Sequence, residues 1–166
     1  MTKTAASLPT HYLTLLLGDD LYALPLGAVK DIRGSTGASA LHGVPEYVIG
    51  WLAHTLGRLP LVDLRRRIGL PPRAGNGPTV TVVLERAGRQ LAVVADAVAE
   101  VVDLGIADEI TVVAAPDARA ELAWLKGAAA AGDRMVLMLD ADQLIAPADL
   151  SSVQAAMAEA AIAQAA

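Results

Sequence analysis

Cysteine and phenylalanine are both absent from this 166-residue chain. Without cysteine the protein has no disulfide, no thiolate zinc site and no cysteine nucleophile. Aromatic residues make up only 3% of the chain while hydrophobic residues make up 54%, so Leu, Val, Ile and Ala must build the core. A core rich in β-branched side chains favours sheets over helical bundles. So apolar a chain also predicts exposed apolar patches, and therefore partners.

Long apolar runs are missing as well. No stretch approaches the roughly 18–20 residues of a membrane span, and the opening MTKTAASLPTHY lacks the apolar core of a secretory signal. The net charge of −5 argues against general nucleic-acid binding. We therefore expect a cytoplasmic protein with no direct membrane insertion and no nucleic-acid partner.

The sequence also lacks the usual enzymatic motifs. The histidines His11, His42 and His54 do not have the spacing of metal ligands. No serine lies in a G-x-S-x-G sequence, and the chain has neither a P-loop nor a G-x-G-x-x-G element after a strand. The acidic residues of GDD (18–20) and DAD (140–142) are typical of turns and helix caps. We expect a binding protein with no catalytic residue, no metal and no cofactor.

What the chain does contain is an unusual basic segment, within and just beyond GWLAHTLGRLPLVDLRRRIGL (50–70). Residues 58–73 hold five arginines against the single Asp63, a local charge of +4 on a chain that is acidic as a whole. A basic segment on an acidic body would steer an acidic protein partner. A solvated, arginine-rich turn explains the same residues equally well, and both interpretations stay open.

Hydrophobic residues alternate along most of the chain, which predicts strands. Three pairs of alternating segments read as hairpins around short turns at 18–20, 54–57 and 86–88. A further strand is predicted at 134–140, and Pro60 indicates an edge strand or a bulge. The low-complexity segment GAAAAG (127–132) is predicted to be a tight connection between strands.

The two halves of the chain resemble each other. YALPLGAVKDI (22–32) matches LAVVADAVAEV (91–101) at an offset of 69 residues. Later, at an offset of 77 residues, Gly50 and Asp63 recur as Gly127 and Asp140. Aliphatic strands also match by chance, but the shared order of features favours a tandem pair of small barrels.

The segments outside these strands are simpler. Residues 1–10 are expected to form a flexible N-terminus, and the Pro- and Gly-rich stretch 69–79 reads as a connector. A helix is predicted from Pro147 to the end of the chain. Its face formed by Leu150, Val153 and Met157 would cover an open barrel end.

Four segments together resemble the CheW-like chemotaxis coupling proteins. Residues 12–34 resemble the family's strand–turn–strand followed by V-x-E-I-R-G, and 44–70 resemble P-x-x-[IV]-x-G followed by P-[VI]-[VI]-D-L-R. Residues 91–104 are similar to V-D-x-V-x-x-V-x-x-L, and 124–145 to the closing L-x-G…D-R-[ML]-[LV]-[IL]-L-[DN]-I-x-x-L. Each motif is weak alone, but all four occur in the family's own order.

The resemblance implies a mainly β fold of two intertwined five-stranded SH3-like barrels with short helical turns and a C-terminal helix. We expect one CheW-like domain at 11–146, with subdomains at about 12–70 and 79–145, and a helix at 147–166. Exchange of strands between the two subdomains is left open.

The family also implies partners. Its members are not enzymes, and they dock to the regulatory domain of the CheA-type histidine kinase and to the cytoplasmic tip of chemoreceptors. The resemblance therefore predicts a chemotaxis signalling adaptor in cytoplasmic receptor arrays at the inner membrane.

Residues that match the family's motifs fall into two groups. The resemblance assigns partner binding to Val29, Asp31, Ile32 and Gly50. It assigns structural roles to Pro60, Asp63, Arg65, Gly127 and Asp140, with Asp63 accepting backbone N–H groups or pairing with an arginine. Arg66 and Arg67 are expected to be solvated.

One loop departs from the family's pattern. The family's N-L-R-G falls on residues 53–56, so the chain lacks the arginine of that motif, and its glycine appears one position later as Gly57. The turn should therefore differ in shape. His54, Thr55 and Arg58 are the candidate partner-binding residues of this loop.

The altered loop leaves alternative functions open. One is a divergent CheW-like scaffold of a pilus-linked or other non-flagellar chemosensory system. Another, from a different class, is a module that senses a small ligand or anion through the +4 segment.

Overall fold

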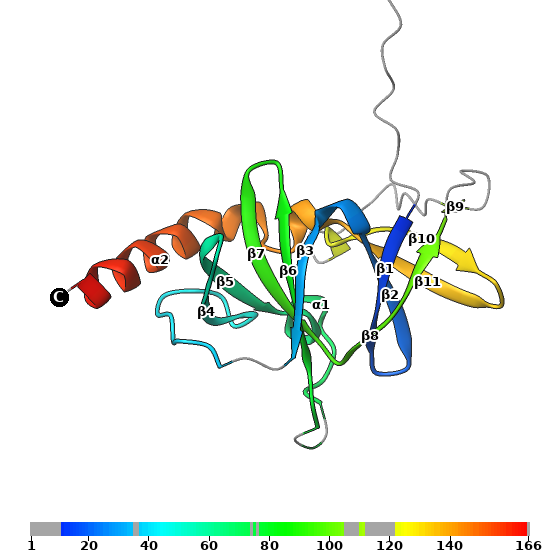
Figure 1. Cartoon of the computed structure of the whole chain (residues 1–166), viewed down its shortest axis with the longest axis horizontal. Coiled ribbons are helices and arrows are strands. Elements are labelled where there is room, and N and C mark those ends of the chain that lie inside the picture. Colours follow the sequence, from blue (N-terminus) through cyan, green and yellow to red (C-terminus); the bar gives the residue numbers. More distant parts are fainter. Residues whose placement is uncertain are drawn as a thin grey trace, which may run out of the picture.

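The computed structural model describes residues 11–34, 37–73, 75, 77–104, 110–111 and 122–165. The predicted flexible segment 1–10 lies outside these residues. The described part of the chain forms two sheets and a C-terminal helix (Figure 1). The predicted mainly β fold class is confirmed.

Sheet A has the strand order β8-β1-β2-β11-β10-β9. Its strands are β1 His11–Leu17, β2 Asp20–Pro25, β8 Ala97–Asp103, β9 Ile110–Thr111, β10 Leu125–Ala131 and β11 Arg134–Leu139. The two-residue β9 makes this a six-stranded sheet, one strand more than predicted.

Sheet B has the strand order β3-β6-β7-β5-β4. Its strands are β3 Val29–Gly34, β4 Val48–His54, β5 Gly57–Asp63, β6 Val80–Arg86 and β7 Arg89–Ala95. Short helical turns follow three of the strands of the two sheets: η1 Leu26–Ala28, α1 Leu64–Ile68 and η4 Ala141–Gln143.

The suspected duplication is visible in the strand order. The two strand orders correspond position by position: β3-β6-β7-β5-β4 of sheet B matches β8-β1-β2-β11-β10 of sheet A, and β9 is the additional strand of sheet A. Each sheet also has one parallel pair at the equivalent place, β2 with β11 and β7 with β5. The chain therefore contains two copies of one five-strand pattern.

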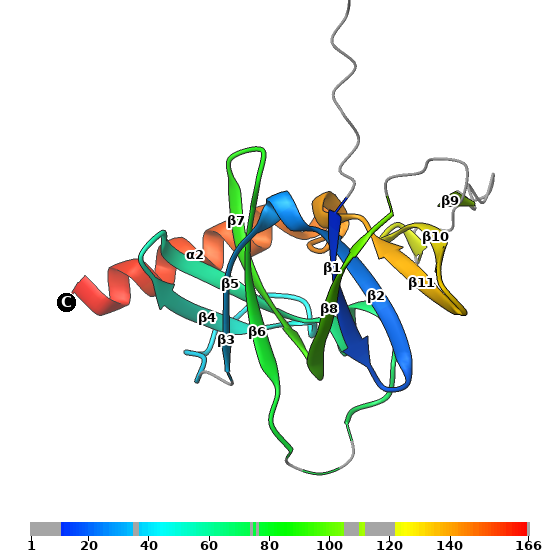
Figure 2. The ribbon, with the colours of Figure 1, turned by 45° about the vertical axis from the view of Figure 1, so that its right-hand side comes forward.

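The sheets do not coincide with the two sequence halves. Within each half of the chain, the third strand leaves the sheet of the first two. β3 follows β1 and β2 of sheet A but pairs with β6 of sheet B, and β8 follows β6 and β7 of sheet B but pairs with β1 of sheet A (Figure 2). Sheet B is continuous from 29 to 95, whereas sheet A combines both ends of the domain. The expected subdomain ranges 12–70 and 79–145 therefore do not coincide with the sheets, and the strand exchange that the sequence left open is present. Alternation predicts strands but not the partner of each strand.

The three predicted hairpins are confirmed as β1–β2, β4–β5 and β6–β7. In the β6–β7 turn Ala87 and Gly88 both have positive φ, 51° and 78°, as a type I′ turn requires. The predicted tight connection at 127–132 is wrong: most of it belongs to β10, which pairs with β11. Alanines have low strand propensity, so pairing with β11 determines their conformation.

A single apolar cluster joins the two sheets. It includes Leu15 and Leu24 of sheet A together with Val62 and Val82 of sheet B, each with no more than 1% of its surface exposed. The shared core explains why the two sheets form one unit.

The C-terminal helix α2, Leu150–Ala165, follows the turn η5, Pro147–Asp149, and runs beside sheet B away from sheet A (Figures 1 and 2). Val153 is buried in the core, and Leu150 and Met157 pack against it, as predicted. None of the helices in the described ranges is long and apolar enough to cross a membrane.

Candidate functional site

Two residues of the expected partner-binding set meet where sheet B closes. His54 Nε2 at the end of β4 lies 3.1 Å from Asp31 Oδ2 on β3. Because β3 and β4 are the two edge strands of sheet B, this contact shows that the sheet curls until its edges meet. We call this junction of β3 and β4 at Asp31 and His54 the seam.

The local backbone determines which nitrogen of His54 carries the proton. The Leu56 backbone N–H donates to Nδ1 at 3.1 Å, so Nδ1 is an acceptor and Nε2 donates to Asp31. The His54 side chain is only 6% exposed. His54 therefore fixes the β4–β5 turn against β3 and does not present a cation to a partner.

Asp31 is the charged group of the seam. Its carboxylate also accepts from Arg33 Nε at 2.7 Å and from the Ile32 backbone N–H at 2.9 Å. The Arg33 guanidinium and then the His54 ring hold the pKa of the Asp31 carboxyl below its usual value. One third of this side chain is exposed, so an ionised carboxylate with oriented partners faces solvent.

Exposed and half-buried residues flank this carboxylate along the chain, and Ile32, its neighbour on β3, points to the opposite face of the strand. Ile32 is 45% exposed and Leu56 is 37% exposed, and Thr55 is exposed while Val29 is half-buried. Each lies within two positions of Asp31 or His54. The structure thus brings together five of the predicted residues, namely Val29, Asp31, Ile32, His54 and Thr55.

Gly50 is placed differently. It is buried and has φ +152°, and an added Cβ would clash with the carbonyl oxygen of Ser39. Ser39 and Trp51 exchange two backbone hydrogen bonds of 2.9 Å beside it. Gly50 therefore allows a close backbone approach, so any effect on a partner would act through the conformation of β4.

Arg58 also points away from the seam residues. Its guanidinium lies over the Trp51 ring, 5.2 Å from the centroid, a cation–π arrangement. Gly57 before it has φ +119°. As expected from the shifted glycine, the positive φ now falls at the last position of the turn.

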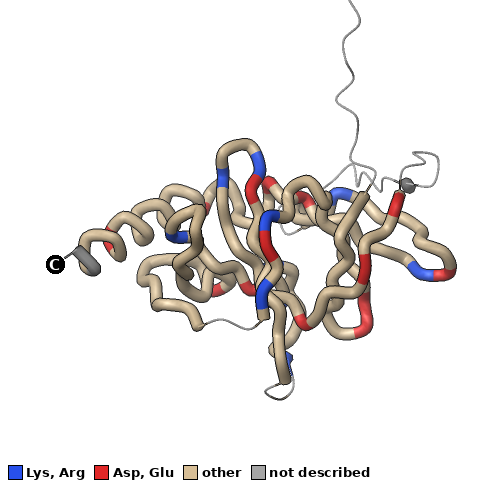
Figure 3. The backbone as a smooth tube through the Cα atoms, in the orientation of Figure 1, with Lys and Arg blue, Asp and Glu red and all other residues tan. Residues whose placement is uncertain are grey.

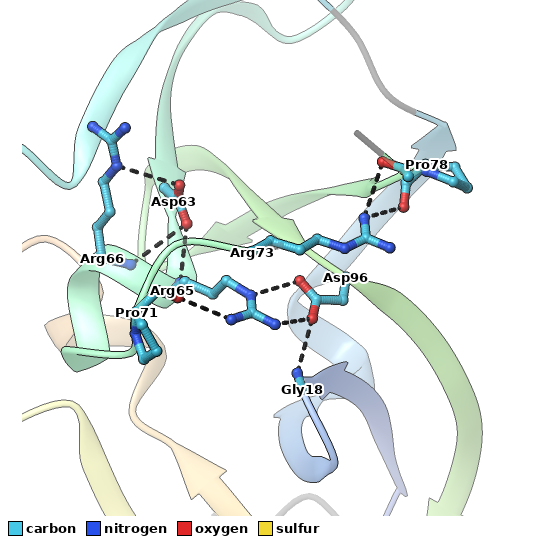
Figure 4. A network of polar contacts seen from close by, with 9 residues as sticks. Gly18, Asp63, Arg65, Arg66, Pro71, Arg73, Pro78 and Asp96 are labelled. Carbon is cyan, nitrogen blue, oxygen red and sulfur yellow. Dashed lines mark hydrogen bonds and ion pairs between the residues drawn. The ribbon is translucent and has the colours of Figure 1, made fainter. Parts of the chain in front are cut away.

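The basic segment is tied mainly to the protein itself (Figure 4). Asp63 accepts from the backbone N–H groups of Arg65 and Arg66 and so caps α1, as expected. Arg65 Nε donates to Asp96 Oδ1 at 2.9 Å, while its Nη2 donates to Asp96 Oδ2 and its Nη1 to the Pro71 carbonyl. Asp96 Oδ2 also accepts from Gly18 N–H at 2.8 Å.

The Arg65–Asp96 pair connects the two sheets. Arg65 follows β5 of sheet B, Asp96 lies between β7 and β8, and Gly18 is in the β1–β2 turn of sheet A. Both side chains of the ion pair are about 15% exposed. Within the arginine cluster, Arg65 therefore has a structural role, because it holds the two sheets together through Asp96. We call the Arg65–Asp96 pair the clamp.

Arg66 and Arg67 behave differently from each other. Arg66 is exposed, as expected, with 56% of its side chain open to solvent. The expectation of a solvated Arg67 is wrong, because its Nε and Nη2 donate to the carbonyls of Leu144 and Gln143. It also covers the Tyr47 ring at 5.1 Å. Its acceptors are about 77 positions away in the chain, so sequence spacing does not reveal them.

The remaining structural residues occupy equivalent places in the two copies. The register shifts just before Gly50 in the β4–β5 pair and just before Gly127 in the β10–β11 pair. Asp63 N–H donates to Tyr47 and Asp140 N–H donates to Trp124, each at 2.8 Å. Asp140 caps η4 as Asp63 caps α1.

The sequence allowed an edge strand or a bulge at Pro60. It lies in β5, which has neighbours on both sides, and the β4–β5 register shifts between Val48 and Gly50, next to Trp51, the partner of Pro60. It pairs with Trp51 of β4, but the pairing of β5 with β7 begins only at Leu61. Pro60 is thus in an inner strand at a point with one paired neighbour, where its missing N–H leaves the ladder intact.

Sequence reasoning missed three residues that organise the structure. Asp96, the partner of Arg65, lies within the quoted segment 91–104. Thr14 is fully buried, and its hydroxyl donates to the Glu100 carbonyl and accepts from the Glu100 N–H where the β1–β8 register shifts. Tyr47 donates to Asp149 and accepts from Ala146, and burial and then the Asp149 hydrogen bond raise its pKa to about 12. For Thr14 and Tyr47, the sequence signal was a hydroxyl-bearing side chain next to apolar residues, which indicates a buried polar group that needs a hydrogen-bond partner.

The described ranges contain no cluster of three or more His, Cys, Asp or Glu residues that would hold a metal ion. The seam offers a carboxylate and exposed aliphatic groups to solvent. Such a surface supports binding through apolar contact with a charged rim.

Comparisons with known proteins give one consistent result. A model of the CheW-like domain matches residues 11–148. The chemotaxis protein CheW of Klebsiella aerogenes is 27% identical over 145 residues, covering 86% of each chain. The probable chemotaxis protein CheW of Rhizobium etli is 27% identical over 130 residues, covering 77% of this chain and 82% of that protein.

The fold comparison agrees. The crystal structure of the scaffolding protein TtCheW from Thermoanaerobacter tengcongensis superposes with a TM-score of 0.74 at 21% identity. The match covers 84% of this chain and 94% of that one. It shows the predicted fold of two SH3-like barrels.

Proposed function

Because the chain belongs to the CheW-like domain family, we propose that it couples the cytoplasmic tips of chemoreceptors to the regulatory domain of a CheA-type histidine kinase. Proteins of this family are non-enzymatic scaffold adaptors. The chain would accordingly act in the cytoplasm, in receptor arrays at the inner membrane, by fixing the geometry of its two partners.

The observation that carries this proposal is the composition of the seam. Three residues that the family resemblance associates with partner binding lie there beside two candidates of the altered loop, His54 and Thr55, although the two segments are more than 20 positions apart. The exposed Ile32 would supply apolar contact area, and the Asp31 carboxylate would accept hydrogen bonds at its rim. Arg33 and His54 hold this carboxylate in one orientation, which lowers the entropy lost when a partner binds.

Separate titrations of the kinase regulatory domain and of a receptor-tip fragment test the proposal. We expect both to bind, and Ile32→Glu to weaken at least one of them at least tenfold, because it places a charge in the apolar contact. Ile162→Glu is the matched control, since Ile162 is an exposed isoleucine, 72% accessible, on α2. Binding of neither partner by the wild-type protein, or equal losses in both variants, would contradict the proposal.

A divergent scaffold of a pilus-linked or other non-flagellar chemosensory system is a second candidate. It is favoured by the β4–β5 turn, where Thr55 stands in place of the family's arginine and His54 is turned inward to Asp31. Preferential binding to a kinase regulatory domain from such a system over a flagellar one would support this candidate.

A further inference from the structure

A cavity of about 350 Å³ lies between the β6–β7 hairpin and the first turns of α2. One wall is formed by α2, with Val153 and Met157 one turn apart, and the other by the ends of β6 and β7. This cavity is separate from the seam residues Asp31 and His54, which do not line it.

The floor of this cavity is aliphatic. Leu84, Leu91, Ile145 and Val153 line it, and each is no more than 8% exposed. An aliphatic ligand placed here would be removed from water on several sides, and apolar burial contributes about 25 cal/mol per Å². The volume falls at the small end of the usual range for ligand pockets, about 300–1,000 Å³.

The rim is basic. Arg86 and Arg89 lie on either side of the β6–β7 turn, and Arg58 on β5 adds a third guanidinium. Figure 3 shows basic positions on both strands of this hairpin. Asp142 is the single carboxylate among the described lining residues, and it pairs with Arg86 at 3.3 Å. A positive rim on a chain of net charge −5 is therefore a local feature.

Arg89 is the best placed of the three to bind a ligand. Its side chain is exposed, and the described residues place no carboxylate within ion-pair distance of it. By contrast, Arg65, Arg67 and Arg73 of the basic segment donate to groups of the protein itself. At the cavity itself, Arg86 pairs with Asp142 and Arg58 lies over Trp51. Arg89 is therefore the guanidinium on which an anion would bind.

We propose that this cavity binds an amphiphilic monocarboxylate, with its aliphatic chain on the Leu84–Val153 floor and its carboxylate at Arg89. The guanidinium would make a charge-assisted hydrogen bond to the carboxylate. A cation of the same chain length would meet three arginines and bind more weakly.

The methionine methyl groups give a direct test. The chain has four methionines, of which Met157 lines the cavity and Met135, 64% exposed, lies on β11 of the other sheet. With [13C-methyl]methionine-labelled full-length protein, sub-micellar decanoate should shift the Met157 resonance saturably and leave Met135 unchanged. Decyltrimethylammonium should produce a clearly weaker Met157 response.

Charge reversal at the rim completes the experiment. Arg89→Glu should weaken decanoate binding at least roughly fivefold, since it removes an attraction and adds a repulsion. Arg134→Glu is the matched control, because Arg134 is an exposed arginine at the turn of the β10–β11 hairpin and should leave the affinity within twofold.

Three results would overturn the proposal: no saturable Met157 shift with decanoate, equal shifts with the cationic amphiphile, or an unchanged affinity in Arg89→Glu. Equal shifts at Met135 and Met157 would also count against it, because they would indicate general adsorption to apolar surface. Since Arg89 is exposed, loss of folding is not expected to obscure the comparison.

Discussion

The guanidinium of Arg65 and the carboxylate of Asp96 form two parallel hydrogen bonds across the junction of the two sheets (Figure 4). Because Asp96 also accepts from Gly18 N–H, one carboxylate connects α1, the β7–β8 connection and the β1–β2 turn.

Arg65 and Asp96 should be energetically coupled. In a double-mutant cycle with Arg65→Met and Asp96→Asn, urea unfolding should give a coupling free energy of about 1.5–3 kcal/mol, the range for hydrogen bonds to charged groups. Arg66→Met is the control and should change the free energy of unfolding by less than about 0.5 kcal/mol, because Arg66 is exposed. A coupling no larger than that of a surface ion pair, up to about 1 kcal/mol, would contradict the clamp.

The same pair should make stability depend on acid pH. The Arg65 hydrogen bond, with help from Gly18 N–H, holds the pKa of Asp96 below its usual value. A depressed pKa in the folded state stabilises the protein above the ordinary aspartate pKa of about 3.9, and this stabilisation is lost as the pH falls through the folded value. The difference in unfolding free energy between wild type and Asp96→Asn should therefore shrink on acidification from neutral pH. A difference that stays constant down to the acid limit would refute this.

Gly50→Ala should destabilise the protein by about 2–4 kcal/mol, through a strained φ and the clash with the Ser39 carbonyl. Gly27→Ala is the control, because Gly27 has no positive φ and an added Cβ would meet nothing within 4 Å. It should be neutral or slightly stabilising. Thermal unfolding of both variants measures the contrast, and equal melting temperatures would disprove the close approach.

The β4–β5 turn should control partner selectivity. Thr55→Arg restores a guanidinium at an exposed position, and an interfacial arginine hydrogen bond is worth about 1.5–3 kcal/mol, or roughly ten- to a hundredfold in affinity. Affinity should shift between kinase and receptor partners while thermal stability stays almost unchanged. Adding Leu56→Gly should strengthen the effect, since it also restores the family's turn.

Thr55→Lys is the control for charge alone, because lysine lacks the planar fork of arginine. Titrations should compare the native kinase domain with one from a conventional CheW system. Agreement of all affinities within about twofold, well below the value of an arginine hydrogen bond, would mean that the loop has drifted without functional effect.

Binding of the kinase regulatory domain should depend only modestly on salt. Arg65, Arg67 and Arg73 are occupied within the protein, and rim charges affect encounter rates more than affinity. The dissociation constant should change less than roughly tenfold as the Debye length falls from about 10 Å to about 3 Å. A steep loss of affinity over this range would make the basic segment the main binding site.

Local patterns predict the hairpins and the helix face of Val153, because these depend on neighbours in the sequence, whereas the role of Asp63 as an acceptor of backbone N–H groups came from the family resemblance. The crossing of β3 and β8 between sheets could not be predicted in the same way, since alternation is the same whichever partner a strand has. The Asp31–His54 contact and the Arg65–Asp96 pair depend on that crossing. The contacts of Arg67 could not be predicted, because its acceptors are main-chain carbonyls, which leave no trace in side-chain composition.

The exchanged strands have a consequence for synthesis on the ribosome. Sheet B is encoded by the continuous stretch 29–95 and would be complete while the rest of the chain is still being made. In the hairpin β1–β2, β1 pairs with β8 and β2 pairs with β11. The hydrogen-bond partner of Thr14 is Glu100, which is synthesised 86 positions later. β1 and β2 can pair with each other early, but their outer edges stay unpaired until β8 and β11 have been made. Those edges are where a nascent chain would most need shielding from aggregation.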